Sequence, residues 1–269
     1  VGANVTGISG APKGLRDWAT KHNARVQPPI SILDQGAGVW NIWIAENRGQ
    51  KIRLKDLNLY GRELLNIDLT GVDLSGATLD EATLTEAQFD GARLERVRAR
   101  RAGFLEASFR GASLKDADFG ASNLQGAAFE SALLDGAGFV AADLRRASLR
   151  KAKLAGAVFA KADLRNCDLT GTDLRRLDLR AARLDGSCLS KADLTGADLS
   201  GANLSGTNLS GGNLTRVTLK GAQLTGAELS GVILDHVDLT GTELEDVDLH
   251  AAELGEVQLS LRQRFQVRR

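Results

Sequence analysis

Ala192-Asp193-Leu194-Thr195-Gly196 and Ala202-Asn203-Leu204-Ser205-Gly206 are two copies of the five-residue unit that decides the fold. The unit reads A-(D/N)-L-x-G, and its register does not slip over most of the chain. Every fifth residue from Leu54 to Leu259 is Leu or Phe, except Ala99. The residue two places earlier is usually small or aliphatic. The period therefore predicts one architecture for most of this 269-residue chain.

A period of five excludes the regular elements whose own periods differ. An α-helix turns about 100° per residue, so a step of five rotates the apolar position by roughly 140° and leaves no apolar face. A flat strand alternates its faces, so an odd step moves the Leu to the opposite face each time. The period fits a chain that turns a corner after each unit and keeps the same two side chains inward. Four such corners close a square coil, so that four successive units make one coil.

These units resemble the pentapeptide-repeat family, in which the central Leu or Phe is called position i and the small residue i−2. The resemblance covers about three quarters of the chain. It implies an all-β fold, a right-handed quadrilateral β-helix (solenoid). The length of the repeat gives about ten coils, and the residues before it predict a helical N-terminal cap. Positions i and i−2 are expected to point inward, whereas i−1, i+1 and i+2 face the solvent.

Folding the chain at four units per coil predicts which aromatic rings meet. Rings that are one coil apart should stack at the inter-strand spacing of about 4.8 Å. Glycine is frequent at i+2, where a tight corner often requires a positive φ. Arg96, Lys161 and Arg176 occupy the same position, which predicts that some corners use a turn without that requirement. The expected stacks are Phe89, Phe109 and Phe129 on one side and Phe119, Phe139 and Phe159 on the opposite side.

The repeat divides the chain into three parts. An N-terminal extension and helical cap is expected over residues 1–51, the β-helix over 52–259 and a C-terminal cap or tail over 260–269. Within the first part, helices are expected over 13–22 and 31–47.

Both ends of a solenoid expose core and unpaired backbone, so each end needs a cover. Trp40 and Trp43 precede the first coil and predict an N-terminal lid. Leu261 and Phe265 alternate with arginines in the tail. This tail is expected either to cap the last coil or to pair with a second molecule. A homodimer through the C-terminal end is therefore one hypothesis.

Catalysis needs convergent groups in a concave site, and a straight rod without loops offers flat faces. The chain contains no Cys-x-x-Cys, no His-x-x-x-His, no phosphate-binding loop and no dinucleotide fingerprint. Cys167 is an inward i−2 residue and Cys188 an outward i−1 residue, so a disulfide is not expected. The sequence predicts a protein that is not an enzyme and that has no metal and no cofactor. Because no apolar stretch is long enough to cross a membrane, a bacterial cytoplasmic protein without a membrane partner is expected.

The formal charge is zero, with 34 basic and 34 acidic residues, but the charges are unevenly distributed. Residues 63–92 contain seven acids and no Lys or Arg, and residues 221–257 contain nine acids and no Lys or Arg. Between them, residues 143–183 contain eleven basic residues and five acids. The rod is thus banded acidic, basic, acidic. Such bands could also do no more than keep a neutral rod soluble.

The first functional hypothesis is a non-enzymatic interaction scaffold that presents its rigid, charge-banded surface to another protein. Flat faces and a long repeat favour this class of function. An acidic partner would face the basic residues of the rod. The candidate interaction surface comprises Arg98, Arg100, Arg101, Arg145, Arg146, Arg150, Lys151, Arg175 and Arg176.

The second hypothesis comes from the family resemblance. Similar pentapeptide-repeat proteins include members that mimic DNA, bind gyrase and protect bacteria from quinolones or other topoisomerase poisons. The zero net charge and the basic middle weigh against it. Direct DNA binding by the basic band is weaker still, because aspartates interleave with the cations and no aromatic platform accompanies them. The candidate DNA-mimic surface comprises Glu228, Asp235, Asp238, Glu243, Glu245, Asp246, Asp248, Glu253 and Glu256.

Overall fold

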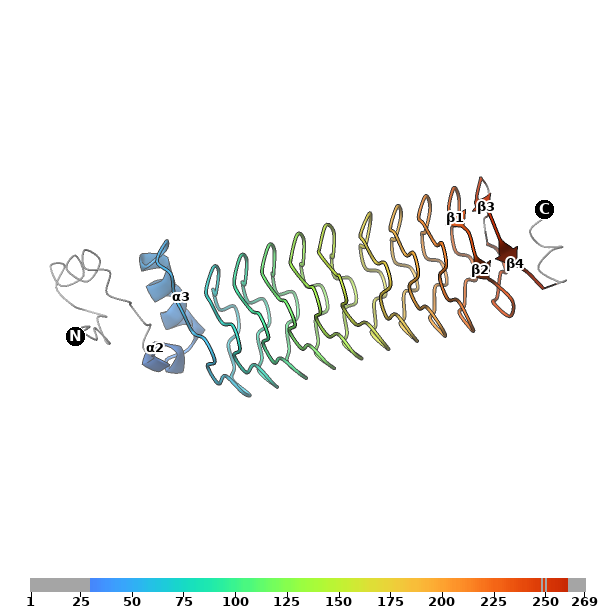
Figure 1. Ribbon diagram of the computed structural model, residues 1–269. Helices are drawn as coiled ribbons and strands as arrows, with labels where there is room; N and C mark the ends of the chain where they lie inside the picture. Colours follow the sequence, from blue (N-terminus) through green and yellow to red (C-terminus); the bar gives the residue numbers. More distant parts are fainter. Residues whose placement is uncertain (1–29, 248, 250, 261–269) are drawn as a thin grey trace.

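The computed structural model describes residues 30–247, 249 and 251–260 of the chain (Figure 1). Two helices, α2 (Ile30–Asp34) and α3 (Ala37–Glu46), lie at one end of a long coil. The coil then runs without interruption to the opposite end of the rod. None of the helices in this described part is long and apolar enough to cross a membrane.

The N-terminal segment differs in one respect from the sequence prediction. The helix expected over 31–47 is divided into α2 and α3 by Gly36, whose φ is 96°. The expected helix over 13–22 and the tail residues Leu261 and Phe265 lie outside the described residues.

A parallel backbone ladder holds the coil together, and the bridged residues are 20 positions apart. Asp143, for example, is bridged to Asp163. Leu144 N–H donates to the Asp163 carbonyl (2.8 Å), and Asp163 N–H donates to the Ala142 carbonyl (2.9 Å). The same pattern recurs on four sides, each formed by one repeat unit. A coil of four units therefore agrees with the sequence prediction.

Each side is too short for a long strand, because most of its five residues belong to a corner. Most bridges therefore involve single residues. Among the described residues, two-residue strands occur near the C-terminal end. There β1 (Ile233–Leu234) pairs in parallel with β3 (Glu253–Leu254), and β2 (Val237–Asp238) pairs in parallel with β4 (Val257–Gln258).

Every corner residue at position i+2, from Asp56 to Ala251, has a positive φ. Arg96, Lys161 and Arg176 have φ values of 57°, 60° and 58°. The prediction that such corners avoid this conformation is therefore wrong. A left-handed φ costs a non-glycine residue about 1–2 kcal/mol, so another interaction must hold these corners.

Hydrogen bonds on both sides of the corner supply that stabilisation. Arg176 N–H donates to the Thr195 carbonyl of the next coil (3.0 Å). The following residue closes the turn, since Leu177 N–H donates to the Leu174 carbonyl (3.3 Å). A turn closed in this way with a positive φ at its third residue is a type II turn. The ladder imposes this turn whatever residue occupies the corner.

Side chains at i and i−2 fill the interior, and nearly all of them from Ile52 to Leu244 are buried. Adjacent rings in the two predicted phenylalanine stacks are almost parallel, with centroids 4.8–5.4 Å apart. Both stacks are thus confirmed. Phe104 lies between them and meets Phe109 and Phe119 edge-on, with centroid distances of 5.5 Å. The rings form one continuous aromatic cluster.

Helix α3 contacts the first coil through side chains that replace a missing strand. The Trp40 indole N–H donates to the Asp68 carbonyl (2.6 Å), and the Asn41 Oδ1 accepts from the Asp68 N–H (2.7 Å). Elsewhere in the ladder, these two backbone groups bond to the preceding coil. Trp40 is fully buried, and Trp43 packs against it with ring centroids 5.3 Å apart.

Both cysteines are free thiols, as the divergence of their positions predicts. The buried Cys167 thiol donates to the Leu144 carbonyl (2.9 Å), and burial raises the pKa of this thiol to about 12. Cys188 is only partly buried.

The aromatic cluster generates a stability prediction. Phe109 contacts four other rings, so Phe109→Ala should lower the free energy of unfolding by about 3–5 kcal/mol. The outward Leu133, which is 40% exposed, provides a control. Leu133→Ala should change the free energy of unfolding by less than about 0.5 kcal/mol. Denaturant titration followed by circular dichroism measures both, and equal small losses would contradict the packing role.

Candidate interaction surface

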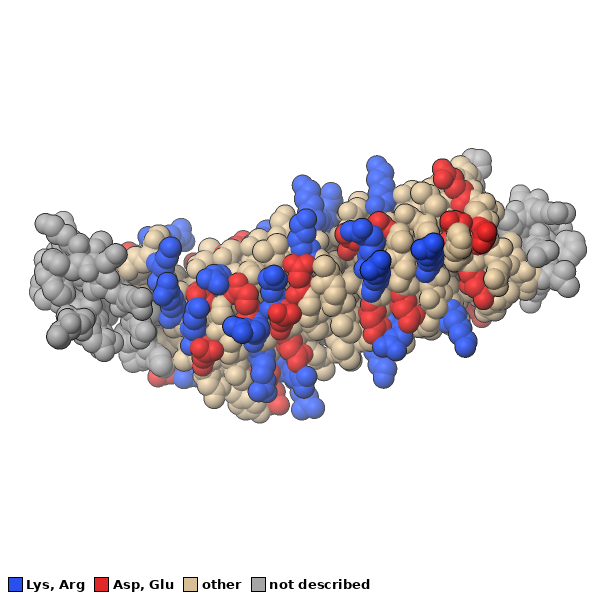
Figure 2. Space-filling view, in the orientation of Figure 1, with Lys and Arg blue, Asp and Glu red and all other residues tan. Residues whose placement is uncertain are grey.

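The nine cations of the sequence-based candidate surface do not form one patch. Because residues 20 positions apart are bridged, Arg145, Arg150 and Arg175 lie on three different sides of the coil, and Arg100 lies on the fourth. Figure 2 shows Lys and Arg along both margins of the visible face as well as on it. The basic middle is a girdle around the rod.

Most of these cations are also paired within the chain. In the sequence Asp-Leu-Arg, the carboxylate at i−1 and the guanidinium at i+1 flank one buried Leu and point the same way. Arg145 binds Asp143 in this manner (Nη2–Oδ2 2.6 Å, Nε–Oδ1 2.9 Å), and Arg175 binds Asp173 (2.6 Å). The hydrogen bond from Arg145 holds the pKa of the Asp143 carboxyl below its ordinary value. A further pair joins Arg150 to Asp168 (3.4 Å).

Three candidate cations have no such partner among the described residues. Arg146, Lys151 and Arg176 occupy i+2 corners, with φ values of 62°, 59° and 58°. A corner side chain projects away from the flat sides, where the carboxylates lie. The remaining positive charge of the middle is therefore spread over separate corners.

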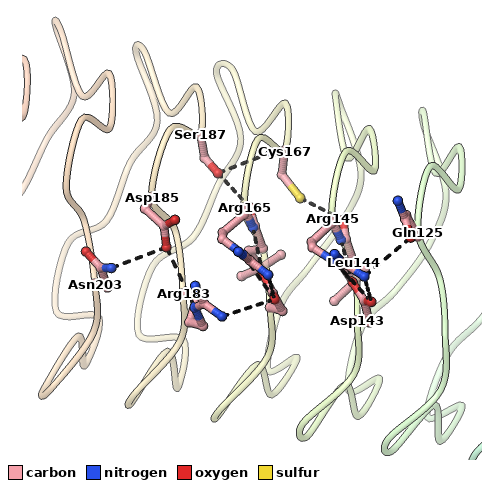
Figure 3. A network of polar contacts seen from close by, with 12 residues as sticks. Gln125, Asp143, Leu144, Arg145, Arg165, Cys167, Arg183, Asp185, Ser187 and Asn203 are labelled. Carbon is pink, nitrogen blue, oxygen red and sulfur yellow. Dashed lines mark hydrogen bonds and ion pairs between the residues drawn. The ribbon is translucent and has the colours of Figure 1, made fainter.

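On the side that carries Leu144, the ion pairs lie one above another along the rod in two separate groups (Figure 3): Arg145 with Asp143 in one, and the pairs from Asp163 to Asp185 in the other. Asp163 and Arg165 follow the Asp-Leu-Arg order (2.6 Å), whereas Arg183 and Asp185 reverse it. Arg183 consequently lies 3.7 Å from Asp163 of the preceding coil and 3.8 Å from Asp185 of its own coil. Gln125 and Asn203 end these groups through hydrogen bonds to Arg145 and Asp185.

The arginines around Ala99 are likewise neutralised. Each has a carboxylate partner on an adjacent coil, so this cluster carries little net charge of its own. The pairs are Arg98–Asp80 (2.6 Å), Arg100–Asp118 (2.6 Å) and Arg101–Glu81 (3.8 Å).

Beside this cluster lies a surface that charge counting did not reveal. The side whose buried column contains Phe119, Phe139 and Phe159 is called the Phe139 side. On three successive coils its outward positions carry mainly small or apolar residues. We call these residues the apolar strip: Gly120, Ala121, Gly138, Val140, Ala141, Val158 and Ala160.

The apolar strip is partly exposed, and it is hollowed at one end. Val140 is 45% exposed. Gly120 has no side chain, and a depression of about 600 Å³ opens there, lined by Arg100, Val140 and Tyr60 among others. The Tyr60 hydroxyl donates to Glu81 (2.7 Å), which raises the pKa of this phenol. The depression therefore has an apolar floor and a charged rim.

The sequence does indicate this strip, because the polar residue that usually occupies position i−1 is missing there. Most units place Asp, Asn or another polar residue at i−1, whereas two successive coils of this side read Gly138-Phe139-Val140 and Val158-Phe159-Ala160. The stacking of successive coils brings these two exceptions together.

The acidic end differs from the middle, because its carboxylates lack cationic partners. The acidic residues that the structure describes between Gly221 and Val257 are called the acidic collar. Among the described residues, none of them forms an ion pair with Lys or Arg; only His236 contacts Asp235 (2.9 Å) and Glu256 (3.3 Å). The register places these acids on all four sides. The collar consists of Glu228, Asp235, Asp238, Glu243, Glu245, Asp246, Glu253 and Glu256, and the ninth predicted acid, Asp248, lies outside the described residues.

No group of three or more His, Cys, Asp or Glu in the described part of the chain is arranged to hold a metal ion.

A four-sided solenoid built from five-residue units, with its interior filled by Leu and Phe, defines a class of repeat protein. The chain belongs to the pentapeptide repeat family: the family model for pentapeptide repeats matches in eight copies within residues 63–98 and 112–260. Members of this family form right-handed quadrilateral β-helices.

Solved structures of other family members resemble the chain. One is HetL, a pentapeptide repeat protein involved in heterocyst differentiation regulation from the cyanobacterium Nostoc sp. strain PCC 7120. It is 29% identical, with 83% of this chain and 94% of HetL covered and a TM-score of 0.36. Another is a variant of QnrB1, a plasmid-mediated fluoroquinolone resistance protein, which is 23% identical with 80% and 95% covered and a TM-score of 0.46. No curated protein matches the chain.

The Asp-Leu-Arg pairs predict a weak acid sensitivity. Hydrogen bonds from Arg145, Arg175 and Arg180 lower the pKa values of Asp143, Asp173 and Asp178. A carboxyl whose pKa is lowered by folding stabilises the fold above its unfolded pKa, about 3.9, and loses that contribution as the pH falls through the folded pKa. The melting temperature should therefore decrease when the pH is lowered below about 4.

A triple variant isolates these pairs. Asp143→Asn, Asp173→Asn and Asp178→Asn together should lower stability modestly at pH 7, since each exposed pair contributes about 0–1 kcal/mol. The same variant should lose less stability than the wild type between pH 5 and pH 2. Thermal denaturation across this range measures both effects, and identical pH profiles for the two proteins would contradict the pairing.

Proposed function

We propose that this protein is a non-enzymatic scaffold that binds another protein on the outside of its rod, through the apolar strip. The proposal includes a bacterial cytoplasmic location and no cofactor. The observation that carries it is the run of Val140, which is exposed, Val158, which is partly exposed, and small residues on a side where most other outward positions are polar. An apolar surface of this kind gains free energy when a partner removes it from water.

The backbone beneath the strip makes it suited to protein recognition. It lies over the aromatic cluster, and each coil is bonded to the coils on both sides, as Phe139 N–H is to the Val158 carbonyl (2.8 Å). A rigid surface needs little ordering when it binds, so less of the interaction free energy is lost. The depression at Gly120 adds a concave element to an otherwise flat side.

The basic girdle supports this role less well than the sequence suggests. Most of its arginines already have carboxylate partners on the same side, as Arg145 and Arg165 do in Figure 3. A partner carboxylate would have to compete with these pairs. Its free cations lie at separate corners, so they offer no single surface.

A charge introduced into the strip tests the proposal. Val140→Asp should reduce partner capture at least tenfold, because an ion at the centre of an apolar contact loses its hydration without compensation. Leu133→Asp is the matched control, since Leu133 is similarly exposed on another side. Affinity capture from an extract of the source organism, quantified by mass spectrometry, should identify proteins lost with Val140→Asp and retained with Leu133→Asp. Equal recovery of all captured proteins with the two variants would contradict the proposal.

A second candidate function is DNA mimicry directed at a topoisomerase such as gyrase. The observation that favours it is the acidic collar, whose carboxylates lack Lys and Arg partners among the described residues. Unpaired carboxylates around a rod can occupy cationic sites that otherwise bind phosphates. QnrB1 is a resistance protein to fluoroquinolones, but its likeness to this chain is too distant to transfer that role.

A supercoiling assay decides between the two functions. If the collar mimics DNA, micromolar protein should inhibit gyrase or protect it from a quinolone. The variant Glu243→Gln, Glu245→Gln and Asp246→Asn should then lose at least half of that effect. Val140→Asp should retain the effect, because its charge change lies on a distant coil. Wild-type protein without any effect on gyrase would reject this candidate.

A further inference from the structure

We infer that the apolar strip binds the same strip on a second copy of this chain, with the two rods face to face and antiparallel. The two-fold axis passes between the coils of Val140 and Ala160. This inference rests on the proposed function, since it names the partner of the same surface.

The order of residues on this side is self-complementary about that axis. An antiparallel two-fold arrangement places Val140 opposite Ala160 and Gly138 opposite Val158, so the apolar centre meets itself. Further out, residues of opposite charge come to face each other. These facing pairs are Arg98 with Asp198 and Asp80 with Lys220, whereas Asp118 faces Asp178.

The depression also acquires an occupant in this register. Gly120 faces Arg180 of the second copy, whose side chain is 60% exposed. The guanidinium of that Arg180 would enter the hollow beside Asp118, so that the Arg180–Asp178 pair of one copy (2.7 Å) meets the Arg100–Asp118 pair of the other (2.6 Å). A long cationic side chain thus meets a hollow with a carboxylate at its edge. The hollow at Gly120 and the long side chain of Arg180 thus meet at the same place in this register.

Neighbouring registers are disfavoured by the same charges. Moving the axis onto the Val140 coil places Arg100 opposite Arg180, and moving it onto the Ala160 coil places Arg100 opposite Lys220. A parallel arrangement brings the Arg98 and Arg100 clusters of the two copies together. Like charges in these positions oppose association. The register with the axis between the Val140 and Ala160 coils avoids these contacts between cations.

The size of the contact sets the strength of the dimer. Seven coil steps from Asp80 to Lys220, at about 4.8 Å each, give a length of roughly 34 Å, and three outward residues give a width of roughly 10 Å. A footprint of this size belongs to the smallest class of specific interfaces, below about 1,200 Å² in total. A weak dimer is therefore expected, with a Kd on the order of tens to hundreds of micromolar.

Sedimentation equilibrium of the full chain from about 10 µM to about 1 mM tests the association. The wild type should approach twice the monomer mass as the concentration rises. Val140→Asp should weaken dimerisation at least tenfold, while Leu133→Asp should leave it unchanged. Circular dichroism confirms that both variants are folded. A wild type that stays monomeric at the highest concentration overturns the inference, as does a dimer that Val140→Asp leaves intact.

Cross-linking between two variants that each carry one accessible cysteine, besides the buried Cys167, tests the antiparallel register. Cys188→Ser removes the partly exposed thiol from both variants. Arg100→Cys in one copy should face Ser200→Cys in the other, so a short bismaleimide should join the two variants when they are mixed. Each variant alone should cross-link poorly, because the introduced cysteines of its two copies would lie five coils apart. Cross-linking of each variant to itself would overturn the register.

The two readouts separate this inference from the proposed function. If Val140→Asp abolishes capture of a different protein and the wild type is monomeric, the strip is an interaction surface but its partner is not a second copy. If dimerisation is lost in Val140→Asp and no other protein depends on the strip, self-association is the function of this surface.

Discussion

The parallel backbone ladder, with its fixed register of four repeat units per coil, is the constraint on which the rest of this structure depends. Each coil can add only one spacing of about 4.8 Å to the rod. A side chain therefore always lies above the residue 20 positions earlier and below the residue 20 positions later. The near-parallel rings of Phe89 and Phe109, the ion pair of Asp163 with Arg183, and the apolar strip are all consequences of this single rule.

The ladder also decides the conformation of the corners against local preference. A left-handed φ disfavours Arg and Lys by about 1–2 kcal/mol, yet Arg96 and Lys161 adopt it like any glycine. The Arg96 and Lys161 corners each donate their N–H to the next coil and close a turn, so changing their conformation would break hydrogen bonds on two coils. Glycine at these positions avoids the backbone strain. Where another residue occupies the corner, the hydrogen bonds of the ladder offset that strain.

This balance explains which features could be predicted from the sequence. The coil of four units and the two phenylalanine stacks depend only on the period, which the sequence displays directly. The corners of Arg96 and Arg176 could not be predicted, because their local preference is overridden by hydrogen bonds to the next coil. The split of the N-terminal helix at Gly36 depends on how α2 and α3 pack against the first coil. Periodicity carries no information about that packing.

Charge counts along the sequence failed for a related physical reason. Eleven basic residues against five acids suggest a basic patch, but the coil distributes them over four sides and Asp-Leu-Arg pairs neutralise several within one repeat. A paired guanidinium directs little field toward a partner. Recognition on such a rod is therefore expected where the repeat lacks its usual polar residue. Val140 and Val158 mark that place, because an outward valine weakens the solubility of a polar side unless another surface covers it.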